Sequence, residues 1–264
     1  MFFAAFTSAF SVCPHFKQQN SSWLGVPIID LAPPVRLKKP VRKRRPLAFQ
    51  KDAPSPSVNT RGTAPVICIT GPSAVGKTSF TLALAEALGA IGLEVLVICC
   101  DDYYRHHWRP HPRFGFDTAA AIDIDALRAE LDEVRHHAAT SLRTYDMGTR
   151  DVARKPLTQS YQLVLLEGAY GPQDLLDDGS ITALFYLEAP LLLRMIRRLQ
   201  RDRKERGRNP IQIIQHMLMH MIPGEWSFIR PLRSLSGLVI TNPRQGQMAA
   251  IELIQALITE SLTM

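Results

Sequence analysis

The segment Gly71-Pro-Ser-Ala-Val-Gly-Lys-Thr78 decides the fold of this chain. It fits the pattern G-x-x-x-x-G-K-[ST], follows the apolar run Val66–Thr70 and opens the amphipathic segment Thr78–Leu88. A strand, a glycine-containing turn and a helix in this order bring backbone N–H groups and a helix N-terminus around a phosphate. The pattern therefore predicts a nucleotide-binding loop made of Gly71, Pro72, Ser73, Ala74, Val75, Gly76, Lys77 and Thr78.

Two side chains of this loop have expected roles. Lys77 reaches the β- and γ-phosphates of the nucleotide, and the Thr78 hydroxyl is a ligand of Mg²⁺. The sequence thus predicts ATP and Mg²⁺ as cofactors. GTPase switches, ATPase motors and small-molecule kinases share such a loop, so the fate of the phosphate must be read from the other motifs.

Short apolar runs alternate with amphipathic segments on either side of the loop. Such alternation predicts an α/β fold, a doubly wound and mostly parallel sheet with helices on both faces, as in P-loop NTPases of the small-molecule kinase type. The expected strands are Val66–Thr70, Val95–Cys100, Leu163–Leu166, Ile181–Tyr186 and Leu238–Thr241. The expected helices are Thr78–Leu88, Ala121–Val134, Leu191–Arg206, Ile211–Met221 and Met248–Leu262.

Acidic residues follow two of the expected strands. Asp101 and Asp102 follow Val95–Cys100, at the edge of a parallel sheet where ligands bind. A carboxylate there can accept the proton of an acceptor hydroxyl during phosphoryl transfer, or it can merely cap the loop. Glu167 follows Leu163–Leu166 and is expected to help hold the magnesium ion, unless it is an incidental strand end.

An arginine-rich segment occupies the predicted helix Leu191–Arg206 and the residues after it. Four of its arginines share one face by i, i+3 and i+4 spacing, namely Arg194, Arg197, Arg198 and Arg201, and Gly207 ends the helix. The segment is either a solvated face or a lid whose arginines neutralise charge on the transferred phosphoryl group. The lid interpretation favours a kinase over a GTPase switch. The residues concerned are Arg194, Arg197, Arg198, Arg201, Arg203, Lys204, Arg206 and Arg208.

Charge divides the chain into two parts. The net charge of the 264 residues is +7, and all of this surplus lies in residues 1–60, which are rich in proline and contain the basic run Arg36–Arg45. These residues are expected to be a disordered extension, which is a targeting peptide to an organelle, a basic tail for anionic partners, or a leader without function. Residues 61–264 form the predicted kinase domain. Their net charge of zero gives no reason to expect a nucleic-acid partner.

Composition fits a protein of a reducing, ATP-containing compartment, and we expect a cytoplasmic location. No apolar run reaches the roughly 20 residues that a membrane span needs. The four cysteines have neither metal-ligand spacing nor a disulfide pattern. A homo-oligomer is left open by the sequence.

Taken in order, the motifs resemble the uridine kinase branch of the phosphoribulokinase/uridine kinase family, from about Val66 to Thr241. The closest match is RRLQRDRKERGRN, which is similar to R-R-x-x-R-D-x-x-E-R-G-R-D. The matching stretches are Gly71–Thr78, Asp101–Arg105, Phe116–Asp123, Tyr145-Asp146, Glu167-Gly168, Arg197–Asn209 and Phe228–Pro231.

The resemblance implies roles for particular residues. It favours Asp101 over its neighbour as catalytic base, and it places Arg201, Arg206 and Arg208 in a lid over the phosphates. The acceptor-binding residues that it implies are Tyr104, Asp117, Tyr145, Arg198 and Gln215. We add Arg150, which is discussed in the next paragraph.

The sequence departs from the family pattern where the base of a nucleoside is held. Met147 and Arg150 replace a phenylalanine and a histidine, and the segment Arg105–Arg113 adds histidines and arginines near the expected acceptor entrance. Three hypotheses follow. The acceptor is the 5′-hydroxyl of uridine or cytidine, or it is an anionic metabolite such as a sugar phosphate or a carboxylate. Otherwise the chain is a regulatory nucleotide-binding protein that transfers no phosphate.

Overall fold

The structure is a computed structural model that describes the backbone of residues 62–263 and the side chains of residues 62–204 and 207–259. The predicted extension 1–60 lies outside the described residues. No helix in the described part of the chain is both long and apolar enough to cross a membrane.

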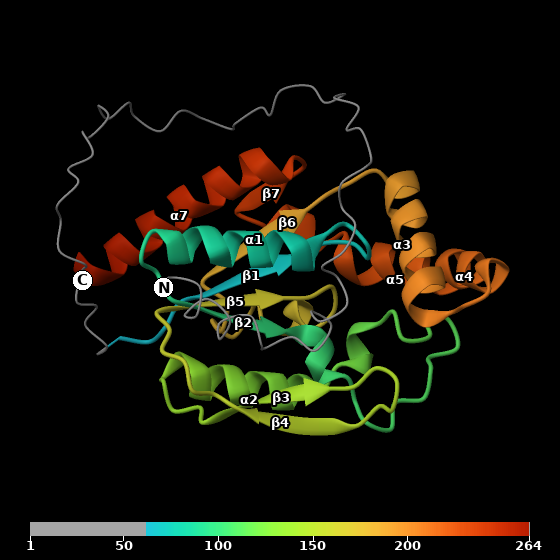
Figure 1. Cartoon of the computed structure of the whole chain (residues 1–264), viewed down its shortest axis with the longest axis horizontal. Coiled ribbons are helices and arrows are strands. Elements are labelled where there is room, and N and C mark those ends of the chain that lie inside the picture. Colours follow the sequence, from blue (N-terminus) through green and yellow to red (C-terminus); the bar gives the residue numbers. More distant parts are fainter. Residues whose placement is uncertain (1–61, 264) are drawn as a thin grey trace, which may run out of the picture.

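A five-stranded parallel sheet in the order β2-β5-β1-β6-β7 forms the centre of the molecule (Figure 1). Its strands are β1 (Val66–Thr70), β2 (Val95–Cys99), β5 (Leu163–Glu167), β6 (Ala183–Leu187) and β7 (Leu238–Ile240). After β1 the chain forms β2 and β5 on one side of β1 in the strand order, and it then forms β6 and β7 on the other side of β1. The carboxyl end of β1 is therefore the switch point at which open parallel sheets bind ligands. The predicted doubly wound sheet is confirmed.

Helices cover both faces of the sheet. Helices α1 (Lys77–Ala90) and α7 (Pro243–Thr263) lie on one face, and α2 (Ile124–Arg135) lies on the other (Figure 1). Beside α2 runs an antiparallel hairpin of β3 (Ser141–Tyr145) and β4 (Val152–Pro156), which the sequence did not predict.

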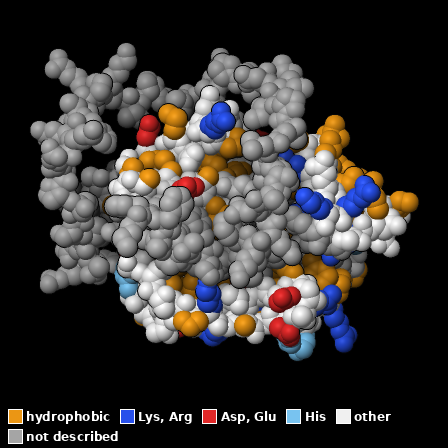
Figure 2. Space-filling view, viewed as in Figure 1, with side chains coloured by type: hydrophobic (Ala, Val, Ile, Leu, Met, Phe, Trp, Pro, Cys, Tyr) orange, Lys and Arg blue, Asp and Glu red, His pale blue; other side chains and the backbone are white. Residues whose placement is uncertain are grey.

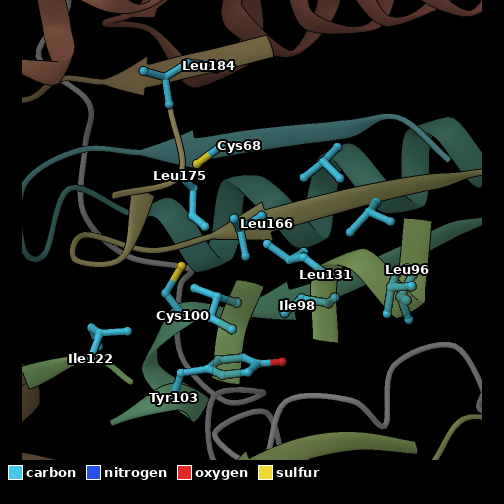
Figure 3. Close-up of a cluster of buried hydrophobic side chains, with 14 of the residues drawn as sticks. Cys68, Leu96, Ile98, Cys100, Tyr103, Ile122, Leu131, Leu166, Leu175 and Leu184 are labelled. Carbon is cyan, nitrogen blue, oxygen red and sulfur yellow. The ribbon is translucent and has the colours of Figure 1, made fainter. Parts of the chain in front are cut away.

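Alternate residues of the strands pack into two separate hydrophobic cores, one on each face of the sheet. In β1, Ile67 and Ile69 pack toward α1 and α7, whereas Val66 and Cys68 pack toward α2. Figure 3 shows the second of these cores, in which Cys68, Leu96, Ile98, Cys100, Tyr103, Leu131 and Leu166 converge. Because both sides of each central strand are buried, the strands read in the sequence as continuous apolar runs.

Residues 191–224, which follow β6 and include α3, α4 and α5, lie beyond the carboxyl ends of the strands (Figure 1). Helix α3 matches the predicted Leu191–Arg206. The predicted helix Ile211–Met221 is instead the start of a longer helical stretch with two π-helical turns, in which Pro223 lacks the N–H that α-helical bonding needs. This stretch consists of α4 (Pro210–His216), η5 (Met217–Met221), α5 (Ile222–Gly224), η6 (Glu225–Ile229) and α6 (Leu232–Leu235).

Local caps explain the remaining differences in helix bounds. Helix α2 begins at Ile124 rather than Ala121, because the Asp123 carboxylate accepts the Ala126 N–H and caps the helix. Helix α7 begins at Pro243 rather than Met248, where Asn242 accepts the Arg244 N–H at 3.0 Å.

Candidate active site

The loop between β1 and α1 has a backbone that depends on two glycines. Gly71 has φ 144°, and a Cβ on it would overlap the carbonyl oxygen of Leu187 in β6. Gly76 has φ 103° and is the left-handed N-cap of α1. Both conformations are strained for residues with a side chain, so the glycines set the curvature that directs N–H groups inward.

Lys77 bends back across this loop. Its Nζ donates to the carbonyl oxygens of Gly71 at 3.1 Å and of Pro72 at 3.3 Å. Burial lowers the pKa of Lys77, while the neighbouring carboxylates of Glu167 and Asp101 raise it. The ammonium group is thus held at the concave side of the loop, where it can meet a phosphate.

Glu167 at the end of β5 lies next to the first turn of α1. The Thr78 hydroxyl hydrogen-bonds with its carboxyl group, which is only 6% exposed. Burial raises the pKa of Glu167, Asp101 adds to the rise, and Lys77 and Thr78 oppose it. A hydroxyl and a carboxylate are ligands that suit Mg²⁺, which commonly takes one or two protein oxygens and completes its shell with phosphates and water. These residues therefore fit the predicted metal.

Asp101 and Asp102 point to different surroundings. Asp102 is buried, and its Oδ1 accepts the Tyr145 N–H of β3 at 3.0 Å. Burial raises the pKa of Asp102 to about 7, against the lowering effect of the Tyr145 N–H, and the charges of Asp101 and Glu167 add to the rise. Asp101 is half-buried, and its charge acts on Lys77 and Glu167. Asp102 therefore joins the hairpin to the sheet, whereas Asp101 faces the loop.

Arg143 of β3, which sequence reasoning did not single out, fixes the backbone of Asp102 and Tyr104. Its guanidinium donates to the carbonyl oxygens of Asp102 at 3.1 Å and Tyr104 at 2.8 Å, and it pairs with Asp123 at 3.2 Å. The hairpin thereby positions the strand end that carries Asp101.

Arginines of helix α3 contact the loop Gly71–Thr78. Arg194 and Arg197 donate to the carbonyl oxygens of Ser73 and Val75, each at 3.4 Å, and Arg198 donates to the Ser73 hydroxyl at 3.0 Å. The predicted common face of these arginines is therefore the face toward the loop. Figure 2 shows Lys and Arg side chains beside hydrophobic ones where α3 and α4 project.

The remaining predicted lid residues are more exposed. Arg201 is partly exposed and pairs with the buried Asp202 at 3.0 Å. Arg208 is exposed after the end of α3. The side chain of Arg206 lies outside the described part of the chain.

Asp117 and Arg198 form the centre of the predicted acceptor site. Both are buried, and Asp117 Oδ1 lies 3.6 Å from Arg198 Nη1. Tyr104 lies near this pair: burial raises the pKa of its hydroxyl, as do the nearby charges of Asp101 and Asp117, while Arg198 lowers it. The structure thus brings Tyr104, Asp117 and Arg198 to the same place as Asp101.

Aromatic rings connect the predicted acceptor site with the β3–β4 hairpin. The Tyr104 ring centroid lies 5.9 Å from that of Tyr145 and 6.3 Å from that of Phe116. The Arg150 guanidinium lies over the Phe116 ring, 5.2 Å from its centroid. Tyr145 and Arg150 therefore belong to one group of side chains with Tyr104.

A cleft with a basic lining opens beside Arg150. It has a volume of about 510 Å³ and is lined by His106, His107, Trp108, Arg109, Thr149 and Arg150. The His106 ring is fixed by a 2.7 Å contact of its Nδ1 with the Arg150 carbonyl oxygen. None of these lining residues is acidic, so the cleft suits a group with negative charge or lone pairs.

Gln215, the predicted acceptor residue of the second lid helix, is exposed on α4. Its neighbour His216 faces the site instead, with Nδ1 3.7 Å from Asp117 Oδ2 and 3.4 Å from Arg198 Nη2. Sequence reasoning missed His216, although the i, i+4 spacing of His216 and His220 was visible in the sequence.

Comparisons with known proteins extend over most of the described chain. The model of the phosphoribulokinase/uridine kinase family matches residues 66–249. The chain is 29% identical to the uridine kinase of Deinococcus deserti, over 75% of this chain and 96% of that protein. It is also 29% identical to the uridine kinase of Chloroflexus aggregans, over 75% of this chain and 95% of that protein.

A solved structure has the same fold. It is described as that of a possible uridine kinase from Bacillus stearothermophilus, is 17% identical and has a TM-score of 0.51. The similarity covers 70% of this chain and 91% of that one.

Proposed function

Since the chain belongs to the phosphoribulokinase/uridine kinase family, we propose that it transfers the terminal phosphoryl group of ATP to a hydroxyl of a small molecule. The observation that carries the proposal is the meeting of Lys77, Glu167 and Asp101 at the carboxyl edge of the sheet. A phosphate site, an oxygen pair for a metal and a free carboxylate are what such a transfer requires.

Each residue has a separate task in this proposal. Lys77 and the loop N–H groups hold the phosphates, and Arg201, Arg206 and Arg208 steady the phosphoryl group as it moves. Asp101 accepts the hydroxyl proton, so that the acceptor oxygen can form its bond to phosphorus as the bond to ADP breaks. Mg²⁺, held by Thr78 and Glu167, supplies positive charge to the phosphate oxygens when bound.

The acceptor that we propose first is the 5′-hydroxyl of uridine or cytidine. Support comes from the uridine kinases that this chain matches over nearly their whole length. In the chain itself, Asp117 and Arg198 can bind sugar hydroxyls, while the partly exposed rings of Tyr104 and Phe116 offer flat surfaces to a base.

The second candidate is a hydroxyl on an anionic metabolite, such as a sugar phosphate or a carboxylate. The cleft that Arg109 and Arg150 line favours it, because guanidinium groups bind phosphate and carboxylate oxygens in pairs.

The test is acceptor-dependent ADP release from ATP·Mg²⁺ by the full chain. The panel contains uridine, cytidine, ribulose 5-phosphate, glycerate and pantothenate, with Asp101→Asn as the inactive control. Turnover on uridine or cytidine that Asp101→Asn abolishes supports the first candidate. Turnover on anionic acceptors alone replaces it by the second.

Arg150→His separates the two candidates further. We expect it to leave turnover on a nucleoside and to weaken that on an anionic acceptor. Saturable ATP binding without ADP release on any acceptor would overturn phosphoryl transfer and favour a regulatory nucleotide-binding protein.

A further inference from the structure

Two buried polar atoms at the acceptor site have no hydrogen-bond partner. They are Asp117 Oδ2 and Arg198 Nε, on side chains that are 11% and 7% exposed. Arg198 Nε also lies 3.6 Å from Asp202 Oδ2 in an ion pair within α3, so Asp117 Oδ2 is the atom available to a ligand. Buried polar atoms are nearly always hydrogen-bonded, and an unpartnered one that faces a site indicates a place for a ligand. Asp117 is held rigidly, since its N–H donates to the Phe114 carbonyl at 2.8 Å and its own carbonyl packs against Gly224.

His216 stands at this unpartnered carboxylate oxygen without bonding to it. Its Nδ1 lies 3.7 Å from Asp117 Oδ2, beyond hydrogen-bond distance, and 3.4 Å from Arg198 Nη2. A guanidinium can only donate, so Nδ1 must be the acceptor in the contact with Arg198. The imidazole is then neutral with its proton on Nε2, and Nδ1 has no proton to donate to Asp117 Oδ2.

Protonation of His216 would reverse this arrangement. An N–H on Nδ1 cannot accept from Arg198, but it can donate to Asp117 Oδ2, and a charge-assisted bond of this kind is strong. The Asp117 oxygen would then be occupied. The two protonation states of one ring therefore decide whether the carboxylate is free for a ligand.

The groups around His216 favour its neutral state. Burial lowers the pKa of His216, and the positive charges of Arg198, His220 and Arg208 lower it as well, whereas Asp117 alone raises it. These groups come from α3, from the residues that follow it, from the loop before α2 and from the helical stretch of His216 itself.

We propose that His216 is a positioning residue for the acceptor: in its neutral form it keeps Asp117 Oδ2 free to bind an acceptor hydroxyl, and in its protonated form it occupies that oxygen. The inference rests on the proposed function, because it assumes that Asp117 binds the acceptor. It assigns to His216 a task that the sequence had suggested for Gln215.

The first measurement is the acceptor KM of the full chain between pH 4.5 and 8.5, a range that extends further below the lowered pKa of His216. We expect it to rise by about tenfold per pH unit below the pKa of His216, as one proton competes with the acceptor, while the KM for ATP stays constant. In His216→Gln, which keeps a neutral side chain of similar reach, the rise should vanish. His220→Gln should keep the rise and move it to higher pH, since the charge of His220 is one of those that lower the pKa of His216.

A second measurement does not depend on turnover. The pKa of His216, followed by NMR of its ring protons, should fall further in Asp117→Asn, because the one neighbour that favours the charged ring is neutralised. If it falls while ADP release is absent on every acceptor, the contact stands and the proposed function fails. An unchanged pKa in Asp117→Asn, or a KM rise that persists in His216→Gln, would overturn the inference.

Discussion

Asp101 and Asp102 are adjacent in the sequence and serve different ends. Asp102 Oδ1 accepts the Tyr145 N–H across 43 positions of the chain, while Asp101 stays half-buried near Lys77 and Glu167. The buried Asp102 is less accessible to the hydroxyl of a ligand than the half-buried Asp101. The difference in partners thus supports Asp101 as the proposed base and gives Asp102 a structural task.

Lys77→Ala should lower kcat/KM by roughly 10³-fold, because the lysine neutralises charge on the phosphates where it develops. The measurement is steady-state ADP release together with binding of a fluorescent ATP analogue. Asp101→Asn provides the contrast, since it should lose turnover and keep nucleotide binding. Near-normal turnover in Lys77→Ala would contradict the assignment of the loop.

The raised pKa of Asp102 predicts that the stability of the chain depends on pH. Its pKa is about 7 in the folded chain against 3.8 for an ordinary aspartate, so the folded state holds the proton more tightly than the unfolded state. The resulting stability is fully present below about pH 4 and is lost as the pH rises through 7. The free energy of unfolding should therefore fall by roughly 2 kcal/mol between pH 5 and pH 8 on account of this group.

Urea unfolding at these two pH values checks the prediction. Asp102→Asn keeps an oxygen for the Tyr145 N–H and should lose this part of the fall. Asp125→Asn, at a side chain that is 85% exposed, should retain the wild-type difference. An equal fall in Asp102→Asn and wild type would show that Asp102 does not retain its proton.

At the scale of elements, the helical stretch after α3 packs closely against the backbone of Asp117. Gly224 in α5 packs against the Asp117 carbonyl, and a Cβ there would also lie 2.8 Å from the Tyr170 hydroxyl. The π-helical turns η5 and η6 flank this point, and such turns are frequent at functional sites. They let one helical segment carry both Gly224 and His216 to Asp117.

Gly224→Ala should destabilise the chain by about 1–3 kcal/mol, although alanine favours helix, because the added methyl group displaces the Asp117 backbone. The acceptor KM should rise as well. Gly89→Ala is the matched helical control: nothing lies within 4 Å of its added Cβ, and a gain of about 0.5–1 kcal/mol is expected. The free energy of unfolding of both variants is measured by urea unfolding. A Gly224→Ala variant more stable than the wild type would contradict the close packing of Gly224 against Asp117.

For the whole molecule, the nucleotide part of the candidate site joins three segments that are far apart in sequence. The loop after β1, the end of β5 and helix α3 all contribute side chains or contacts. A ligand that bridges them binds the folded chain alone, and it stabilises that chain by RT ln(1 + [L]/Kd).

ATP with Mg²⁺ at about 100 times its Kd should add about 2.7 kcal/mol to the stability of the full chain. Thermal unfolding with and without the nucleotide measures this. Asp101→Asn should retain the rise in Tm, Lys77→Ala should lose most of it, and chelation of the metal should reduce it. The same rise in Lys77→Ala and wild type would place the nucleotide elsewhere.

Features that depend on neighbouring residues could be predicted from the sequence. The phosphate loop, the alternation of strands and helices and the bounds of α3 follow from short-range patterns, since a turn, an apolar run or a helical period is complete within a few residues. The acidic residues at the ends of β2 and β5 were found in the same way, as the carboxyl ends of parallel strands meet at one edge.

The tertiary structure alone decided what depends on partners distant in the chain. The short β3–β4 hairpin is stabilised by its contacts with Asp102 and α2, and His216 rather than Gln215 faces Asp117 because packing sets the rotation of α4. Local pattern does not specify such contacts, since a residue's partners across the fold come from separate segments. The sequence therefore determined the Gly71–Thr78 loop, and the packing determined which side chains surround Asp117.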